Sequence, residues 1–424
     1  MDSWDDFCQD VQGIFDSLKN NNNGRQATYI PQLAQVNPDL YGVSVYNVDG
    51  REFNNGDYEV DFCIQSCSKP LTFGMILEEH GLDRVSECIG REPSGASFNS
   101  FTFNRENKPF NPLINAGAIM ACSLVKPNLP SVDRYEHIIN KWKSIVGDNV
   151  GFDNSVYLSE KNTAYRNNAL ANLMMENGIF PKNTNIQETL ELYFQACSIT
   201  MNCHSMAKFA AMLANGGICV DTQERVLSPD VVKDVLCVMY SSGMYDYSGR
   251  WSFQVGLPAK SGVSGSIFVV VPKVCGICIY SPRLDEMGNS VRGVEFCQEL
   301  VRRYKVHIFD TLVVGVGTQK KGIAGDLTSQ CLFDMCKTNN YQALEKFLEG
   351  NDVDVNAGDY DDRRPLHIAS EENAYECVKI LLDYMADATL QDRWGNAPID
   401  VINKHHEKGE WLDLKINKRR KIND

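Results

Sequence analysis

The chain has 424 residues, of which 43% are hydrophobic and 23% are charged. This length and composition fit a folded protein of two or three domains, and they exclude a mainly disordered chain or a small disulfide-stapled module. Acidic residues number 55 against 41 basic ones, which gives a net charge of −14. We therefore expect no nucleic-acid partner and no membrane partner for the body of the chain.

The cysteines indicate a reducing compartment. There are 15, an odd number, and they are scattered among apolar neighbours, as free buried thiols are. Cys275 and Cys278 have CxxC spacing within a strand-like run, where residues three apart face opposite sides of a sheet. We therefore predict no metal site, no redox site and no resident cofactor.

The N-terminal segment 1–26 is rich in Asp and contains neither an Arg-rich transit pattern nor a signal-peptide apolar core. We expect the chain as written to be cytoplasmic, and a mitochondrial location if another form carries a targeting extension. Apolar spacing over residues 4–18 predicts an amphipathic helix, and the Asn-rich segment 19–24 has the composition of a linker.

A first domain is predicted over residues 27–310. Alternating apolar residues over 41–60, with turns at Asp49-Gly50 and Asn55-Gly56, predict an antiparallel hairpin. A helix is expected from about Ser66 to His80 and ends at Gly81. Residues 110–250 read as mostly helical, residues 251–280 as strands, and residues 291–304 as a closing helix. Strands, then helices, then strands again predict an α+β fold whose sheet joins distant segments.

A second, small all-α domain is predicted after a linker at 311–326. The interval from Pro365 to Pro398 equals the interval from Asp359 to Asp392, and both the interval and the pattern are those of ankyrin repeats. We place the ankyrin repeats at 327–412, with two full units and a preceding one over 333–356. The basic tail 413–424 is predicted to be a solvated terminus.

The main candidate for chemistry is Ser66, three residues before Lys69 at the start of a predicted helix. Residues i and i+3 share a helix face, so the amine can reach the hydroxyl, and a partly buried Lys can act as a base. A helix N-terminus also offers unpaired backbone N–H groups that can hold an oxyanion.

The Ser-x-x-Lys spacing alone is weak, because it recurs at Ser123/Lys126 and Ser205/Lys208. A downstream Lys260-Ser261-Gly262 on a predicted strand makes the Ser66 instance more specific. Together they form the arrangement of penicillin-recognising serine acyltransferases. No histidine lies in a nucleophile-elbow or zinc-binding context, so a Ser–Lys mechanism is favoured.

Several segments in this order closely resemble serine-dependent glutaminases, particularly the animal kidney- and liver-type enzymes with C-terminal ankyrin repeats. The resemblance covers roughly residues 27–310, together with the repeats. The segments are Tyr29-Ile30-Pro31-Gln32-Leu33, Gln65-Ser66-Cys67-Ser68-Lys69-Pro70, Glu92-Pro93-Ser94-Gly95, Asn111-Pro112-Leu113-Ile114-Asn115-Ala116-Gly117-Ala118, Gly243-Met244-Tyr245-Asp246 and Leu257-Pro258-Ala259-Lys260-Ser261-Gly262-Val263.

The resemblance implies a β-lactamase-like fold, with an antiparallel sheet and helical layers, and hydrolysis of L-glutamine to L-glutamate and ammonia. It implies that Ser66 is the nucleophile, Lys69 its base and Tyr245 a proton relay, with Lys260 also catalytic. The amides of Ser66 and Val263 would form the oxyanion hole. The residues that resemble the substrate cradle are Tyr29, Gln65, Asn115, Glu160, Asn167, Tyr193 and Tyr245.

The chemistry of the cradle fits an amino-acid substrate independently. A carboxylate such as Glu160 suits the substrate ammonium. Neutral donors suit its carboxylate, and Asn115, Asn167 and Tyr193 provide them.

The resemblance also suggests a homotetramer built as a dimer of dimers, and activation by inorganic phosphate. The loop 97–104 aligns with the family's mobile loop at the dimer contact. Small Ser97, Ser100 and Thr102 stand where larger or basic side chains are usual. This departure bears on phosphate activation, filament formation and allosteric inhibition, and it leaves the expected catalysis untouched.

Two alternatives stay open at this point. One is an amidohydrolase for another small amide such as asparagine, because the cradle residues do not set the length of the substrate side chain. The other is an ankyrin-based interaction protein with an inert catalytic domain. Retention of Ser66, Lys69, Tyr245 and Lys260 argues against the second. The ankyrin repeats themselves suggest a protein partner.

Overall fold

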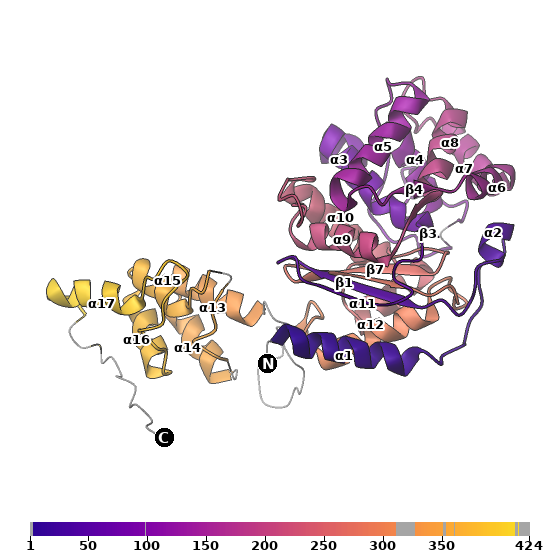
Figure 1. Cartoon of the computed structure of the whole chain (residues 1–424). Coiled ribbons are helices and arrows are strands. Elements are labelled where there is room, and N and C mark those ends of the chain that lie inside the picture. Colours follow the sequence, from indigo (N-terminus) through magenta and orange to yellow (C-terminus); the bar gives the residue numbers. More distant parts are fainter. Residues whose placement is uncertain are drawn as a thin grey trace. The chain divides into compact units, whose positions relative to one another are not determined.

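The computed structural model describes residues 3–97, 99–310, 327–350, 353–359, 361–411 and 414. It divides into two units, Met1–Ile308 and Phe309–Asp424, each described here by itself (Figure 1). The predicted linker 311–326 and all of the tail 413–424 except Leu414 lie outside the described residues, so both stay predictions.

A five-stranded antiparallel sheet forms the centre of the first unit, in the order β2-β1-β8-β7-β6. The strands are β1 (Gly42–Asn47), β2 (Glu52–Gly56), β6 (Ala259–Ser261), β7 (Ser266–Val271) and β8 (Cys275–Tyr280). The predicted hairpin is β1 and β2, in which Val43 pairs with Asn55. On its other edge β1 pairs with β8, where Val43 faces Ile279. Segments near the two ends of this unit therefore meet in one sheet, as the sequence predicted.

Helices cover both faces of this sheet (Figure 1). Helix α9 (Cys203–Ala214) packs against β1, β7 and β8 on one face. On the other face α12 (Val291–Arg303) lies beside α1 (Ser3–Leu18). The period of two in β7 explains this burial. Phe268 contacts Phe209 of α9, whereas the next position back, Ile267, lies against Gly293 of α12.

Most of the remaining helices form a layer beyond α9, with a second sheet of order β3-β5-β4. The exception is α11, which lies beside α12, where Gln298 donates to Oε1 of Gln254 at 3.0 Å. The strands of this sheet are β3 (Phe62–Cys63), β4 (Gly151–Phe152) and β5 (Ile199–Met201). The helices are α2 (Pro31–Ala34), α3 (Lys69–Ser86), α4 (Asn115–Leu124), α5 (Ser131–Val146), α6 (Asn154–Asn162), α7 (Tyr165–Glu176), α8 (Ile186–Cys197), α10 (Pro229–Ser242) and α11 (Ser248–Gln254).

Two predicted elements differ from the structure, and one helix was not recognised individually. The helix expected from Ser66 begins as a 3-10 turn, η1 (Gln65–Ser68), and continues as α3 past Gly81, whose φ of 75° produces a kink instead of an end. The strand expected from Trp251 is wrong, because residues 248–254 form α11 and the Trp251 indole donates to the Leu257 carbonyl at 2.8 Å. Helix α6 lies within the region predicted to be mostly helical, but it has no amphipathic pattern of its own to mark it, because Val156 is its one buried side chain.

The Asn-rich segment 19–24, predicted to be a linker, is fixed to the first unit by Arg292 of α12. The Arg292 side chain is buried. Its guanidinium donates to the carbonyl oxygens of Lys19 at 3.0 Å and Asn21 at 2.9 Å, and to Oδ1 of Asn22 at 3.2 Å. The donors come from a residue far along the chain, so the local composition of the segment gave no sign of them.

We expect Arg292→Lys to lower the free energy of unfolding by about 2–4 kcal/mol, because an ammonium cannot reach all of these acceptors from the buried position of Arg292. Urea unfolding measures the loss, and limited proteolysis should reveal new cleavage within residues 19–24. Arg302→Lys is the matched control, since Arg302 lies on the same helix with its side chain 68% exposed. Equal midpoints for the two variants would contradict this role for Arg292.

The second unit is all helical within its described residues. Its helices are α13 (Leu327–Lys337), α14 (Tyr341–Gly350), α15 (Pro365–Glu371), α16 (Tyr375–Asp383) and α17 (Pro398–Glu407). The two repeated prolines begin α15 and α17, where their missing N–H costs nothing. The repeated Asp has a structural reason as well. Oδ1 of Asp392 accepts the N–H groups of Trp394 and Asn396 at 2.9 and 2.8 Å, which closes the turn before α17.

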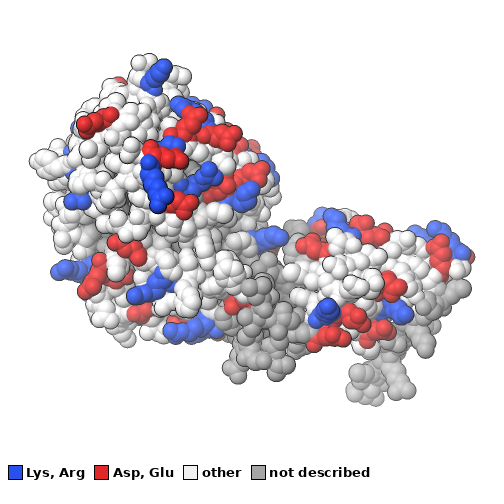
Figure 2. All heavy atoms as spheres, turned by 180° about the vertical axis from the view of Figure 1, so that it is seen from behind, with Lys and Arg blue, Asp and Glu red and all other residues white. Residues whose placement is uncertain are grey.

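Across the part of the chain that the structure describes, no helix is both long and apolar enough to span a bilayer. Figure 2 shows basic and acidic side chains interspersed over the visible face of each unit.

Candidate active site

Ser66 lies at the centre of the first unit, in the η1 turn between β3 and α3. Gln65 before it has a φ of 47°, which turns the chain sharply out of β3. Lys69 is the first residue of α3, so Ser66 and Lys69 stand one turn apart on a continuous helical path. Both side chains are buried.

The Lys69 amine is held from the far side by α4 and the segment before it. Its Nζ donates to the Leu113 carbonyl at 3.2 Å and to Oδ1 of Asn115 at 2.9 Å. Burial lowers the pKa of Lys69 to about 8. An appreciable neutral fraction therefore exists near neutral pH, which a base requires.

Lys260 is a second buried amine, in the middle of β6. Its Nζ donates to the Ser261 carbonyl at 2.6 Å and lies 4.4 Å from the centroid of the Tyr245 ring. Burial, aided by the charge of Lys69, lowers the pKa of Lys260 to about 7. Two buried amines with lowered pKa values thus lie close enough for the charge of Lys69 to affect Lys260.

Gly262 allows the end of β6 to approach the Ser66 turn. A Cβ at this position would lie 3.0 Å from the Ile64 carbonyl oxygen and 3.2 Å from Sγ of Cys67. The glycine of the Lys-Ser-Gly sequence therefore favours this close packing, because a larger residue would make its neighbours shift slightly.

Tyr245 connects Ser66 to Lys260. It begins the 3-10 turn η2 (Tyr245–Tyr247) with a φ of 53°, a conformation that non-glycine residues rarely adopt. Burial raises the pKa of the Tyr245 phenol, and a hydrogen bond with the Ser66 side chain opposes this rise. Gly243 lets η2 come close, because a Cβ there would lie 1.8 Å from the Ala259 carbonyl oxygen beside Lys260.

Glu160 of α6 closes one side of the site together with Tyr29 and Gln65. Its Oε1 accepts hydrogen bonds from the Tyr29 hydroxyl at 2.6 Å and from Nε2 of Gln65 at 3.1 Å. Half of the Tyr29 surface is exposed, although its hydroxyl points inward. Burial raises the pKa of Glu160, against these two hydrogen bonds.

Asn115 and Asn167 form another side of the site. Nδ2 of Asn115 donates to Oδ1 of Asn167 at 3.1 Å, while Oδ1 of Asn115 accepts from Lys69. Tyr193 of α8 is buried nearby, where burial raises the pKa of its phenol and the Glu160 charge adds to the rise. These residues come from α4, α7 and α8, and the structure brings them to the same place as the Ser66 turn.

Val263 follows β6 and packs with Ile30, Cys63 and Val156, on the side of the site that holds Tyr29 and Glu160. Among the backbone hydrogen bonds that turns, loops and caps form in the described residues, none uses the N–H of Ser66 or of Val263. An oxyanion hole requires backbone N–H groups that have no partner within the protein.

All the residues predicted for the site therefore lie in one region, but their roles stay predictions. Within the described residues no group of three His, Cys, Asp or Glu side chains is arranged to hold a metal ion. Cys275 and Cys278 of β8 are buried free thiols.

Comparison with known proteins identifies the family. A family model described as Glutaminase matches residues 24–309, which is more than half of the chain. The chain belongs to the glutaminase family. A second model, for ankyrin repeats, matches residues 348–402. The predicted glutaminase with C-terminal ankyrin repeats is thus confirmed, and so is the assignment as an enzyme of this family.

Relatives of this glutaminase come from animals and bacteria. The mouse mitochondrial liver isoform of glutaminase is 40% identical over 94% of this chain and 67% of the relative. A Nostoc glutaminase is 44% identical over 73% of this chain and 91% of the relative. The crystal structure of Mglu in its tris and glutamate form superposes with a TM-score of 0.67 at 35% identity, over 72% of this chain and 67% of that one. The predicted fold class is confirmed.

Two residues that support the site were not predicted. The Leu113 carbonyl that holds Lys69 is a backbone acceptor and has no signal in the sequence. Asn111 positions it, since its Oδ1 accepts the N–H groups of Leu113 and Ile114 at 3.0 and 3.2 Å. An Asn-Pro pair just before a helix is a turn signal that could have indicated Asn111.

Proposed function

We propose that this glutaminase hydrolyses L-glutamine to L-glutamate and ammonia through a covalent intermediate on Ser66. The observation that supports this most is the buried Ser66 hydroxyl, which hydrogen-bonds with the Tyr245 phenol. Two amines of lowered pKa accompany it, Lys69 one helical turn away and Lys260 over the Tyr245 ring. A nucleophile of this kind needs a nearby base, and a neutral lysine is one.

In the first half of the reaction, Oγ of Ser66 attacks the side-chain amide carbon and its proton passes to neutral Lys69. The amides of Ser66 and Val263 hold the resulting oxyanion. When the carbon–nitrogen bond breaks, the departing nitrogen takes a proton through the Tyr245 hydroxyl and leaves as ammonia. Lys69 returns its proton to Tyr245, which leaves a glutamyl ester on Ser66.

In the second half, water attacks the ester carbon and gives its proton to the same relay. The ester bond breaks, Ser66 recovers its proton, and L-glutamate is released. Lys260, which lies over the Tyr245 ring, keeps the phenol in place and favours any negative charge that develops on its oxygen.

The cradle would bind the backbone end of the substrate. Glu160 pairs with the substrate ammonium, and this charge restores the ionised carboxylate that burial disfavours. Asn115, Asn167 and Tyr193 donate to the substrate carboxylate. Tyr29 and Gln65 hold Glu160 through its Oε1.

We expect Glu160→Gln to reduce kcat/KM by about 30- to 1,000-fold, mainly through KM, because a buried charge pair lost from one side costs about 2–4 kcal/mol. Steady-state kinetics with L-glutamine measure the effect. Glu191→Gln is the matched control, since Glu191 lies in the same region but pairs with Lys161 at 2.7 Å and is partly exposed. A Glu160→Gln loss confined to kcat would contradict a role in ammonium binding.

The direct test follows ammonia and L-glutamate release from L-glutamine by the intact chain, with L-asparagine in parallel. A reaction quenched during turnover and digested should carry a glutamyl group on the peptide that contains Ser66. Preferential turnover of L-asparagine would favour the alternative that the chain is an amidohydrolase for another small amide. Turnover of neither amide would favour the alternative of an ankyrin-based interaction protein with an inert catalytic domain.

Assembly and regulation are further proposals. We propose a homotetramer that is a dimer of dimers, activation by inorganic phosphate, and a protein partner for the ankyrin repeats. Light scattering and turnover, each with and without phosphate, test the first two. The cytoplasmic location expected from segment 1–26 stays a prediction, while the name of the mouse relative places that protein in mitochondria.

A further inference from the structure

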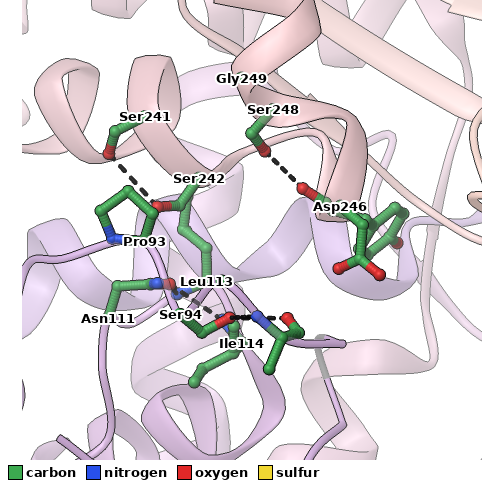
Figure 3. A pocket seen from close by; sticks show the side chains of 13 residues that line it. Pro93, Ser94, Asn111, Leu113, Ile114, Ser241, Ser242, Asp246, Ser248 and Gly249 are labelled. Atoms are coloured by element: carbon green, nitrogen blue, oxygen red, sulfur yellow. Dashed lines mark hydrogen bonds between the residues drawn. The ribbon is translucent and has the colours of Figure 1, made fainter.

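A cavity of about 350 Å³ lies behind Tyr245. Three segments of the first unit line it, residues 93–96, 111–114 and 241–249 (Figure 3). Its size is within the range of pockets that hold small organic ligands. We call it the Tyr245 back pocket.

The Tyr245 back pocket shares Tyr245 with the predicted substrate cradle but none of the other cradle residues. Tyr245 lines the pocket, whereas Ser66, Lys69 and Glu160 do not. Leu113 lines it too, and the carbonyl of Leu113 holds the Lys69 amine. A molecule in the pocket would therefore contact the proton relay and the support of the base without reaching the nucleophile.

The lining indicates the kind of molecule that would bind. Serine hydroxyls line it from several elements, with Ser242 on α10, Ser248 on α11 and Ser94 on the facing loop (Figure 3). Ser248 and Ser94 donate their protons to the carbonyls of Tyr245 and Ala96, both at 2.7 Å, so toward a ligand they act as acceptors. The exposed side chain of Asp246 adds a carboxylate, and none of the described residues that line the pocket is Lys, Arg or His. This lining disfavours anions and suits a small cation or neutral molecule that carries hydroxyl groups.

Such a molecule could stabilise the backbone conformation of Tyr245. Its φ of 53° is a strained conformation, which persists where the surroundings hold it. A ligand shifts a conformation only as far as it binds one state better than another. A molecule that fits the pocket as it stands binds the state in which Tyr245 reaches Ser66.

We propose that the Tyr245 back pocket binds a small hydroxylated amine, and that its occupant raises turnover by stabilising Tyr245 in its catalytic position. The coupling to turnover rests on the proposed function, whereas binding itself does not. Because the lining disfavours anions, this site is proposed as separate from any activation by phosphate.

A larger side chain at position Gly249 should fill the pocket without a steric clash. Gly249 lines the cavity from α11, and a Cβ added there would meet no atom within 4 Å, so a side chain can enter the open space. Gly249→Leu should occupy the pocket, and Gly249→Ala is the matched control that leaves most of it open. Leu and Ala both have a higher helix propensity than glycine, so neither replacement should weaken α11.

The test uses the protonated tris(hydroxymethyl)aminomethane cation as the probe, with the full chain in a buffer free of other hydroxylated amines. Calorimetry should detect saturable binding to the unmodified protein, to Gly249→Ala and to the Ser66→Ala variant. Gly249→Leu should weaken binding at least about tenfold, equivalent to about 1.4 kcal/mol. Asp246→Asn should weaken binding of this cation but not of neutral glycerol. In turnover assays the probe should raise kcat with little change in KM.

Several outcomes would overturn the proposal. Absence of binding, or binding that Gly249→Leu leaves unchanged, would show that the pocket is not the site. Competition between the probe and L-glutamate would place the probe in the substrate cradle. Binding at the pocket without a change in kcat would refute the coupling. Because Ser66→Ala reports binding without catalysis, failure of the proposed function would be seen separately.

Discussion

Replacing Ser66 by Ala should reduce kcat/KM for L-glutamine by about 10⁴-fold or more, because the variant lacks the atom that forms the covalent bond. The residual rate would come from the cradle and the oxyanion amides acting on water. Ammonia release, measured at substrate concentrations on both sides of KM, gives the two constants separately. The glutamyl label on the peptide that contains Ser66 should also disappear.

A matched control for this variant is Ser123→Ala. Ser123 is also followed by Lys three residues later, but its buried hydroxyl donates to the Met120 carbonyl at 2.7 Å within α4. We expect this control to keep its turnover within about threefold. Ser66→Ala should still bind L-glutamate, because none of the cradle hydrogen bonds uses the Ser66 hydroxyl. Turnover retained by Ser66→Ala would refute the covalent mechanism.

The parts of the fold that the sequence predicted have local signals. The β1–β2 hairpin follows from alternation and an Asp-Gly turn, and the ankyrin helices follow from prolines at a fixed period. The buried pair β7 and β8 is visible as two apolar runs around Pro272 and Lys273. In each case the residues that decide the structure lie within one element or its neighbour.

The parts that were missed depend on distant contacts. Trp251 suits a strand by composition, but its place in α11 is determined by packing and by the Leu257 carbonyl. The segment 19–24 reads as a linker until Arg292 reaches it from α12. Glycine commonly marks the end of a helix, but at Gly81 the chain kinks and then continues as a helix. Propensity cannot indicate such tertiary effects.

The site residues also divide into those with a local signal in the sequence and those without one. Ser66, Lys69 and Lys260 were found by spacing, because their chemistry depends on short sequence intervals. Glu160, Asn167 and Tyr193 have ordinary helical contexts, and family resemblance alone pointed to them. The structure shows why, since Glu160 meets Gln65 across 95 residues and Asn167 meets Asn115 across 52. Side chains that converge from separate helices leave no periodic mark in the sequence.

Removal of the Lys69 amine should have the second largest effect. We expect Lys69→Met to lower kcat by about 10³- to 10⁴-fold with little change in KM, because general-base catalysis is lost while the cradle stays. Lys69→Arg should be as slow, although it keeps a cation beside Asn115, since a guanidinium does not lose its proton. An equal loss of kcat in the two variants would show that the reaction needs a base at this position and not only a positive charge.

The pH profile tests the same assignment. The pKa of Lys69 is lowered to about 8 and that of Lys260 to about 7, and the base must be neutral to act. Turnover by the unmodified protein should therefore rise as pH increases through this range and fall as the amines become protonated below it. The residual rate of Lys69→Met should lack the limb near pH 8. If Lys69→Arg instead kept both its rate and that limb, while Lys260→Met lost them, Lys260 would be the base, because the limb belongs to whichever amine must lose its proton.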